Sequence, residues 1–353
     1  MRVVIPLLGL TPHGGNRVLT QIANEFVRQG HACRILTPQQ STRFAFRLDP
    51  RVELAFVGPA LKHKTGRWLW YLLMLPRHVR HDDCIIANHF LTAIPSRLLA
   101  VLRDKRVVYL VQDVEYRFFP RMLRLLAEPL CRWTWRIKTV IPANAYLAAE
   151  LRQLGATPLE PLRLGVDPFF LEPASRPRAP RYDVICLLRA EHHKRADRLV
   201  ALSESCLAQG ISVLCICQDK ELANRHRGQF SAIAHPADDE ELRAAYDSAR
   251  IFVLTSEHEG FALPPLEAMA RGLPAVLFPC GGPSVYARDD DNCVLISDES
   301  VATACREIKA LLGDGPRYRR LSESAANTAR QYDMSAAAAD FVARCVALQS
   351  SVQ

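Results

Sequence analysis

The stretch TSEHEGFALPPLEAMARGLPAVLFPCGG, residues 255–282, holds the pattern from which the fold of this chain can be worked out. It places Glu259 and Glu267 with seven residues between them, a glycine directly after the first glutamate and two prolines before the second. A pair of glutamates at this spacing occurs by chance in most proteins of this length. The residues around the pair must therefore carry the interpretation.

Those surrounding residues predict a strand, a loop and a helix in succession. RIFVLTS (250–256) is a continuous apolar strand, EHEGFAL (257–263) the loop at its C-terminal end, and PPLEAMARG (264–272) a helix. Pro264 or Pro265 suits the first helical position, where a missing N–H costs nothing, and Gly272 ends the helix. The start of this helix is therefore expected at the carboxyl edge of a sheet, facing a cleft.

A helix start of this kind suits a phosphate. Gly260 allows close approach of the backbone, and the helix dipole favours an anion. The amides expected to donate to it are those of Phe261, Ala262 and Leu263. Glu267, placed in the first helical turn, can accept hydrogen bonds from the two hydroxyls of a ribose, and Glu259 would reach a sugar beyond a diphosphate. In the structural alternative, Glu267 only balances the helix dipole and Gly260 only makes a turn.

The same alternation of strands and helices extends over almost the whole chain. Continuous apolar strands separated by helices predict parallel sheets covered on both faces. Four prolines at positions 168, 173, 177 and 180 interrupt the pattern and predict a linker. We therefore expect an α/β fold with two doubly wound, Rossmann-like domains facing a central cleft. The expected boundaries are 1–166 for the N-terminal acceptor-binding domain, 167–181 for the linker, 182–334 for the donor-binding domain, and 335–353 for a C-terminal helix that can pack back on the first domain.

Composition limits the classes of function. With 49% apolar and 23% charged residues, the 353-residue chain is typical of globular proteins. Its net charge of +8 favours acidic partners: nucleotide phosphates, nucleic acid or an anionic membrane surface. The 11 cysteines are scattered through apolar runs, which favours reduced core residues of a cytoplasmic protein over a disulfide framework or a zinc site. No apolar run is long enough to span a bilayer, and residues 1–15 fit a buried first strand better than a signal peptide.

At this point a family resemblance is evident. EGFALPPLEAMARGLPAV (259–276) resembles the E-x7-E signature of the retaining glycosyltransferases of family four, which have the GT-B fold. GGNRVLTQIANEFVRQGH (14–31) resembles the family's first loop and helix, and RLGVDPFFLEP (163–173) its interdomain segment. The resemblance covers almost the whole chain and is specific for the family, but it is poorly specific for the substrate.

The resemblance implies roles for several residues of the second half. Glu267 would bind the ribose of the nucleotide, and Glu259 the donor sugar. Arg189 and Lys194, in LLRAEHHKRAD (187–197), would bind the diphosphate, whose negative charge grows as the glycosidic bond breaks. The family's usual glycine after the lysine is Arg195 here, so either Lys194 or Arg195 would make the contact. In the structural alternative, this run is a solvated helix start.

In the first half, Gly14 and Gly15 would approach the diphosphate from the other wall, or simply form a tight turn. His89 stands where many family members place a histidine near the donor sugar; the alternative is a structural histidine. VVYLVQDVEYRFFP (107–120) resembles a segment of the WsaF-like rhamnosyltransferases of surface-polysaccharide assembly. Three further candidates to line the acceptor or donor site follow from it, with a plain strand-to-helix turn as the alternative: Gln112, Asp113 and Glu115.

Two other segments are candidates for a metal site and for a membrane-binding surface. DDDN (289–292) has the D-x-D spacing of manganese-dependent glycosyltransferases, but it follows a short helix and is expected to be an exposed loop. His192 and His193 are adjacent and would point in different directions. We therefore expect no catalytic metal. Residues 61–81 mix cations with aromatic residues and predict either a surface helix on an anionic bilayer or a packed first-domain helix.

The sequence thus predicts a retaining, metal-independent glycosyltransferase without a cofactor, whose partners are a nucleotide-diphosphate sugar and a glycan or lipid-linked glycan acceptor. Rhamnose from dTDP-rhamnose is the first expectation for the donor, in surface polysaccharide biosynthesis. The alternatives are an epimerase or phosphorylase on the same fold, or a non-catalytic scaffold that binds nucleotide-sugar. Nucleic-acid binding has no recognisable motif to support it. A cytoplasmic location is expected, at the inner membrane face if residues 61–81 bind lipid.

Overall fold

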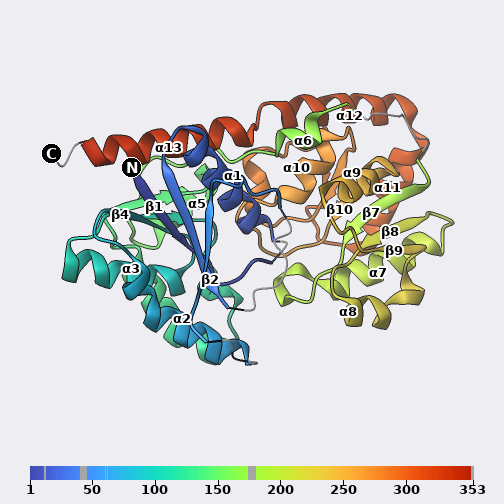
Figure 1. Cartoon of the computed structure of the whole chain (residues 1–353). Coiled ribbons are helices and arrows are strands. Elements are labelled where there is room, and N and C mark those ends of the chain that lie inside the picture. Colours follow the sequence, from blue (N-terminus) through green and yellow to red (C-terminus); the bar gives the residue numbers. More distant parts are fainter. Residues whose placement is uncertain (12, 40–45, 60, 62, 174–179, 351–353) are drawn as a thin grey trace. The chain divides into compact units, whose positions relative to one another are not determined.

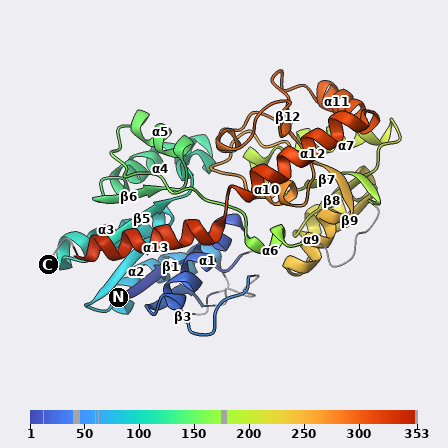
Figure 2. The same ribbon diagram turned by 90° about the horizontal axis from the view of Figure 1, so that it is seen from above.

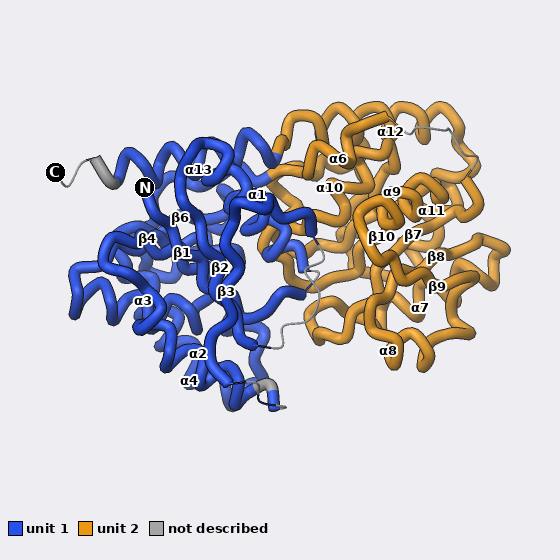
Figure 3. Tube along the Cα trace, in the orientation of Figure 1, with its two compact units in different colours: residues 1–164, 334–353 blue, residues 165–333 orange. Residues whose placement is uncertain are grey.

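The chain divides into two compact units, coloured separately in Figure 3. Unit 1 comprises Met1–Leu164 and Met334–Gln353, and unit 2 comprises Gly165–Asp333. The computed structural model describes residues 1–11, 13–39, 46–59, 61, 63–173 and 180–350. Residues 174–179 of the predicted linker, including Pro177, lie outside the described residues.

Unit 1 is built on a six-stranded sheet in the order β3-β2-β1-β4-β5-β6, in which every described pairing is parallel. Figure 1 labels β1, β2 and β4 of this sheet. The strands are rich in Val, Ile and Leu, and the central residues of all but the edge strand β3 are buried, as expected for a sheet covered on both faces. The strands of unit 1 are β1 (Arg2–Pro6), β2 (Ala32–Pro38), β3 (Glu53–Val57), β4 (Asp83–Ala87), β5 (Val107–Val111) and β6 (Thr139–Pro142).

Amphipathic helices cover this sheet, and one of them comes from the end of the chain. The helices of unit 1 are α1 (Gly14–Arg28), α2 (Lys64–His78), α3 (Phe90–Arg103), the short η1 (Glu115–Phe118), α4 (Arg121–Thr134), α5 (Ala145–Gln153) and α13 (Met334–Ser350). Helix α13 packs beside α1, as both views of the ribbon show (Figures 1 and 2). Phe341 and Val342 of α13 are fully buried, so this helix completes the core of unit 1.

Unit 2 repeats the same plan. Its six strands are all parallel and follow the order β12-β11-β10-β7-β8-β9. The strands of unit 2 are β7 (Tyr182–Leu187), β8 (Val213–Ile216), β9 (Ala232–Ala234), β10 (Ala249–Leu254), β11 (Ala275–Leu277) and β12 (Cys293–Leu295). Its helices are α6 (Pro168–Leu171), η2 (His192–Lys194), α7 (Ala196–Leu207), α8 (Lys220–Arg225), η3 (Arg227–Gln229), α9 (Asp239–Asp247), α10 (Leu263–Ala270), η4 (Gly282–Val285), α11 (Val301–Gly313) and α12 (Gly315–Arg330).

Each sheet reverses its strand order at one point. In unit 1 the chain builds outward from β1 to one edge, then returns to place β4 on the other side of β1. Unit 2 does the same around β7 and β10. The loops leaving the carboxyl ends of these strand pairs diverge to opposite faces of the sheet, and the crevice between them is where doubly wound folds bind ligands. The doubly wound α/β fold predicted for both halves is therefore confirmed.

The predicted end of α10 at Gly272 is correct, because a glycine marks it. Gly30 and Gly272 follow α1 and α10 in the left-handed conformation, with φ of 79° and 77°. The linker differs from expectation, since residues 168–171 form the helical turn α6. Asp167 accepts a hydrogen bond from the Phe169 amide and so caps this turn, which begins with a proline.

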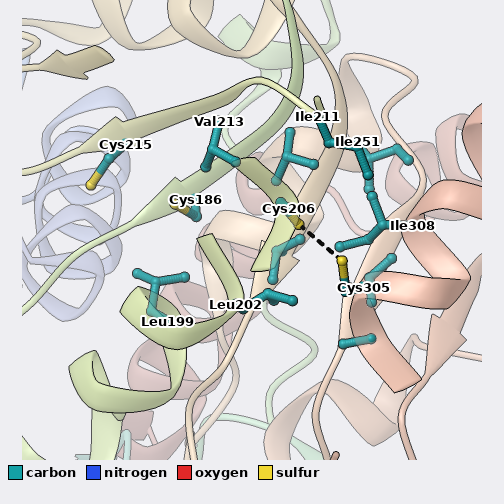
Figure 4. Close-up of a cluster of buried hydrophobic side chains, with 14 of the residues drawn as sticks. Cys186, Leu199, Leu202, Cys206, Ile211, Val213, Cys215, Ile251, Cys305 and Ile308 are labelled. Carbon is teal, nitrogen blue, oxygen red and sulfur yellow. Dashed lines mark hydrogen bonds between the residues drawn. The ribbon is translucent and has the colours of Figure 1, made fainter. Parts of the chain in front are cut away.

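All eleven cysteines are buried and free, as the sequence predicted, and all lie within the described residues. Several belong to the core of unit 2, where Cys206 and Cys305 approach with sulfur atoms 3.8 Å apart (Figure 4). Burial among aliphatic side chains raises the pKa of the Cys206 thiol well above its usual value. These side chains act as small apolar residues.

Helix α2, in the segment 61–81, is half packed and half exposed. Tyr71 and Leu75 are fully buried, and the Trp68 indole N–H donates to the carbonyl of Leu8 at 2.8 Å. Leu69 and Trp70 are exposed. The packing alternative thus holds for one face of the helix, while the other face offers apolar side chains to the surroundings. Among the described residues, no helix has the length and apolar character required to cross a bilayer.

Candidate donor site and unit 1 loops

The glutamate loop of unit 2 holds Glu259 in one orientation. Glu259 is buried, with 9% of its surface exposed. One carboxylate oxygen accepts a hydrogen bond from the Ser256 hydroxyl at 2.7 Å, and the other lies 2.8 Å from the Lys194 ammonium. Ser256 follows β10, whereas Lys194 follows β7, and these two strands are direct neighbours in the sheet. The structure therefore brings together, at the point where the strand order reverses, a glutamate and a lysine that are 65 residues apart.

A second loop fixes the backbone of Glu259. Its amide donates to the carbonyl of Cys280 at 2.8 Å, and its carbonyl accepts from the amide of Gly282 at the same distance. A Cβ atom on Gly282 would lie 2.5 Å from the carbonyl carbon of Gly260, so the two loops can approach this closely only with glycine at position 282. The loops after β10 and β11 thus support each other at the site.

The turn into α10 leaves several backbone amides available. Ala262 adopts the left-handed conformation with φ of 62°, and its carbonyl accepts from the buried Tyr286 hydroxyl at 2.7 Å. Within the part of the chain that the structure describes, three amides at this turn donate to no other group: those of Phe261, Ala262 and Leu263. Such amides at a helix N-terminus are suited to bind an anionic oxygen.

Glu267 lies deeper than the sequence suggested. The expectation that it stands in the first turn of the helix is wrong, because α10 begins at Leu263, one residue before the two prolines, and has no acidic residue in its first turn. Glu267 is buried at 4% exposure and accepts a hydrogen bond from the Tyr246 hydroxyl at 2.9 Å. A tyrosine of α9 therefore orients the carboxylate that was assigned to the ribose.

The three cationic side chains after β7 differ in their partners. Arg189 is half-buried, and its side chain has no hydrogen-bond or ion-pair partner within the described ranges. Lys194 is held by Glu259, whereas Arg195 pairs with Asp197 at 2.8 Å. Arg195 has φ of 53°, in the left-handed region, which is easiest for glycine. This conformation agrees with the glycine that the family resemblance implies at this position.

Next to this segment the surface is hollowed. The hollow lies against the start of α7 and is lined by Ala190, Glu191, His192, Arg195, Ala196, Asp197 and Glu257. The amide of Glu257 donates to the carbonyl of His193 at 2.8 Å, which ties the glutamate loop to the cationic segment. One edge of unit 2 thus combines a hollow, two cations and unpaired amides.

In unit 1, the loops after β1 and β5 meet. Gly14 and Gly15 begin α1, and the amide of the Gln112 side chain donates weakly to the Gly15 carbonyl at 3.4 Å. A Cβ atom on Gly15 would lie 3.1 Å from the oxygen of that side chain. Asp113 accepts a hydrogen bond from the Val114 amide at 2.7 Å. Gln112 therefore reaches the glycine pair, while Asp113 also shapes its own turn.

His89 and Glu115 both have structural partners. His89 caps α3: its Nδ1 accepts from the Leu91 amide at 3.2 Å, and burial lowers the pKa of its imidazole to about 4. The proton of the neutral ring is therefore on Nε2. Glu115 lies in the core at 4% exposure, 3.3 Å from the Tyr109 hydroxyl, and burial raises its pKa to about 8. Its carboxyl faces Tyr109 rather than an open surface.

The acidic run at 289–292 is engaged by arginines. Asp290 pairs with Arg317 at 2.9 Å, and Asp291 pairs with Arg288 at 2.7 Å. The three aspartates are exposed, as the sequence predicted, whereas Asn292 is fully buried. No group of three or more histidine, cysteine, aspartate or glutamate side chains is placed to hold a metal in the described part of the chain.

Comparison with solved structures identifies the class of fold. The sucrose-phosphate synthase of Thermosynechococcus elongatus superposes with a TM-score of 0.83 at 16% identity, covering 99% of this chain and 100% of that one. WaaG, a glycosyltransferase involved in lipopolysaccharide biosynthesis, superposes with a TM-score of 0.73 at 19% identity, covering 96% and 99% of the two chains. Anabaena HepE in complex with UDP and glucose does so with a TM-score of 0.74 at 14% identity, covering 98% and 99%. The chain has the GT-B fold.

Family comparison then identifies the domains. Residues 12–169 match the model of Glycosyltransferase Family 4, and residues 172–328 match the model of Glycosyl transferases group 1. Both halves of the chain therefore consist of glycosyltransferase domains.

Two relatives give the degree of similarity. The D-inositol 3-phosphate glycosyltransferase of Corynebacterium aurimucosum is 34% identical over 29% of this chain and 24% of its own length. The sulfoquinovosyl transferase of Arabidopsis thaliana is 27% identical over 56% of this chain and 42% of its own length. The matched segments thus span less than half of either relative.

Sequence reasoning missed the groups that hold the glutamates: Ser256, Tyr246 and Gly282. Two of them stood inside the opening stretch, where Ser256 precedes the first glutamate by three residues and Gly282 belongs to a glycine pair at its end. The pair of glycines was a usable sign of close backbone approach. Tyr246 could not be linked to Glu267 from sequence, because the contact joins residues of two different helices that are 21 positions apart.

Proposed function

We propose that this chain is a retaining, metal-independent glycosyltransferase that moves a sugar from a nucleotide-diphosphate donor to a hydroxyl of a glycan acceptor. The observation that carries the proposal is the pair formed by Lys194 and Glu259, 2.8 Å apart, at the strand-order reversal of unit 2. It places a cation beside a carboxylate that can accept hydrogen bonds from sugar hydroxyls. Two glycosyltransferase domains on the GT-B fold support the same class of reaction.

The proposed donor site assigns one chemical task to each group. The Glu267 carboxylate accepts hydrogen bonds from the ribose hydroxyls, and the amides at the start of α10 donate to the diphosphate. Arg189 and Lys194 stabilise the negative charge that grows on the leaving diphosphate. Glu259 orients the donor sugar. The acceptor hydroxyl attacks from the face that the diphosphate leaves, and the departing phosphate takes its proton, so no side chain acts as a nucleophile.

The residues of unit 1 receive supporting roles in this proposal. Gly14 and Gly15 let the backbone approach the ligand, and the Nε2–H of His89 donates a hydrogen bond to a sugar hydroxyl. Gln112 and Asp113 contribute to the acceptor side. Glu115 acts indirectly, since its carboxyl is buried against Tyr109 and helps to shape the turn that carries Gln112 and Asp113.

The donor sugar is proposed on narrower grounds. dTDP-rhamnose follows only from residues 107–120, and the names of the matched relatives contain other sugars, such as the mannosyltransferase of Mycolicibacterium hassiacum. The donor must therefore be tested as a panel. A glycan of surface polysaccharide biosynthesis, free or lipid-linked, is the proposed acceptor.

A thermal-shift panel tests the donor class and the metal independence together. Purified protein is heated with dTDP-, UDP- and GDP-sugars, with and without a chelator. A ligand that binds only the native state raises the melting temperature, so we expect an increase with one nucleotide that the chelator leaves unchanged. No increase with any nucleotide, or an increase that the chelator removes, would contradict the proposal. Product analysis without an acceptor separates an epimerase, which needs none, from a transferase.

A further inference from the structure

Helix α4 of unit 1 is packed in the opposite way to a core helix. The residues that it buries are small: Ala127, Cys131 and Thr134. Their spacing of four and three residues places them on one face. Its large apolar side chains are exposed, to 83% at Met122, 51% at Leu123, 76% at Leu125, 69% at Leu126 and 45% at Leu130. These large apolar side chains therefore do not contribute to the core of unit 1, and the stability of the fold does not explain their presence on α4.

The neighbouring helices add to this surface. Helix α3 packs against both α2 and α4. Leu98, Val101 and Leu102 of α3 are exposed, and so are Leu69, Trp70 and Leu73 of α2. Most of the exposed large apolar side chains of the described residues lie on these three helices. We call the surface formed by these side chains the apolar face. A large exposed apolar surface on a monomer marks an interaction site.

The charges of these helices define the partner. Glu128 is the only acidic residue in the sequences of α2, α3 and α4. Cations accompany the apolar side chains on all three helices: Arg67 and Arg77 on α2, Arg103 on α3, and Arg121, Arg124 and Arg132 on α4. Arg97 of α3 differs, because its guanidinium lies over the Trp133 ring, 4.2 Å from the centroid. Arg121, Arg124 and Arg132 recur along α4 on one stripe beside the exposed leucines and Met122. A helix with one apolar face and one cationic face lies in the interface of an anionic bilayer.

We propose that the apolar face is a membrane-binding surface, in which α4 lies in the plane of an anionic bilayer with Met122, Leu125 and Leu126 inserted between lipids. The exposed arginines of the three helices, among them Arg121 and Arg124, contact the lipid phosphates. This surface does not depend on the proposed donor site, because none of the residues assigned to that site lies on α2, α3 or α4. It also differs from the sequence-based expectation, because α4, outside the segment 61–81, is the main element.

The test is a vesicle flotation assay with matched variants. Wild-type protein is mixed with vesicles of phosphatidylcholine and phosphatidylglycerol, or of phosphatidylcholine alone. We expect binding to the anionic vesicles that weakens with added salt, and weaker binding to the neutral ones. The double variant Leu125→Ser with Leu126→Ser should bind anionic vesicles about ten-fold more weakly or worse, because two inserted leucines are lost.

The control is the double variant Phe56→Ser with Leu159→Ser, which removes exposed apolar side chains of unit 1 outside the three helices. It should bind as wild type does, and both variants should keep the wild-type melting temperature. Absent binding to anionic vesicles, equal binding to neutral ones, or an unaffected Leu125 and Leu126 variant would overturn the proposal. The proposal would also be overturned if the wild-type protein were a dimer, the Leu125 and Leu126 variant were a monomer, and neither bound vesicles. A second copy of the chain would then cover the apolar face.

Discussion

At the scale of single residues, Lys194 is the cation on which the proposed chemistry depends most. Its ammonium lies 2.8 Å from Glu259, and its side chain is only 21% exposed. Replacing it with methionine keeps the length and removes the charge. Since loss of one group that stabilises developing negative charge costs about 10²–10³ in rate, we expect kcat to fall by that factor. The control is Lys220→Met, an exposed lysine of α8, and equal loss in both variants would argue against the role of Lys194.

The buried Glu115 predicts a dependence of stability on pH. Burial raises the pKa of its carboxyl from 4.5 to about 8, so the folded protein holds a proton that the unfolded chain releases above pH 4.5. The contribution of Glu115 to the free energy of unfolding is therefore fully present below pH 4.5 and is lost as the pH rises to about 8. The Glu115→Gln variant should lack this loss and be more stable than wild type at pH 8, by roughly 1–3 kcal/mol. Urea unfolding at pH 5 and pH 8 measures the free energy of unfolding of both proteins. The same change between the two pH values in wild type and in Glu115→Gln would contradict the assignment.

At the scale of elements, Gly282 predicts how the glutamate loop is held. An alanine there would place its Cβ 2.5 Å from the backbone of Gly260 and 2.6 Å from the carbonyl oxygen of Glu259. The loop must shift, so we expect about 1–3 kcal/mol of destabilisation and a clear loss of nucleotide affinity. Gly228→Ala is the matched control, because nothing lies within 4 Å of the added Cβ. Unchanged nucleotide affinity in Gly282→Ala would show that the loop does not form the site.

The elements also show what sequence alone can predict. The strand before Glu259 can be predicted from its apolar run, and the end of α10 from Gly272. Both signals act within the segment that contains them. The sequence predicts that α10 starts at Pro264, whereas in the structure it starts at Leu263. The turn before it depends on another loop, from which the Tyr286 hydroxyl donates to the carbonyl of Ala262. The family resemblance placed Lys194 and Glu259 at one ligand but did not predict their ion pair, because neither segment determines how the distant strands β7 and β10 align.

At the scale of the whole molecule, the last helix, α13, packs against α1 and belongs to unit 1. Its buried face includes the fully buried Phe341 and Val342. A chain ending at Asp333 should therefore lose several kcal/mol of stability in unit 1, about 3 kcal/mol or more, while the cooperative unfolding of unit 2 stays in place. Differential scanning calorimetry separates the two transitions. A chain lacking only residues 351–353, which lie outside the described residues, is the control; equal melting of both shortened chains would contradict this account.

The central claim is that unit 2 holds a nucleotide through Glu267, and binding calorimetry tests it most directly. The nucleoside diphosphate selected by the thermal-shift panel is titrated into wild type, Glu267→Ala and Glu323→Ala, the last being an exposed glutamate of the same unit. Loss of a hydrogen-bonded carboxylate costs about 1.5–3 kcal/mol, so the affinity of Glu267→Ala should fall by about ten-fold or more, while Glu323→Ala binds as wild type does. Wild-type affinity in a folded Glu267→Ala variant would contradict the claim.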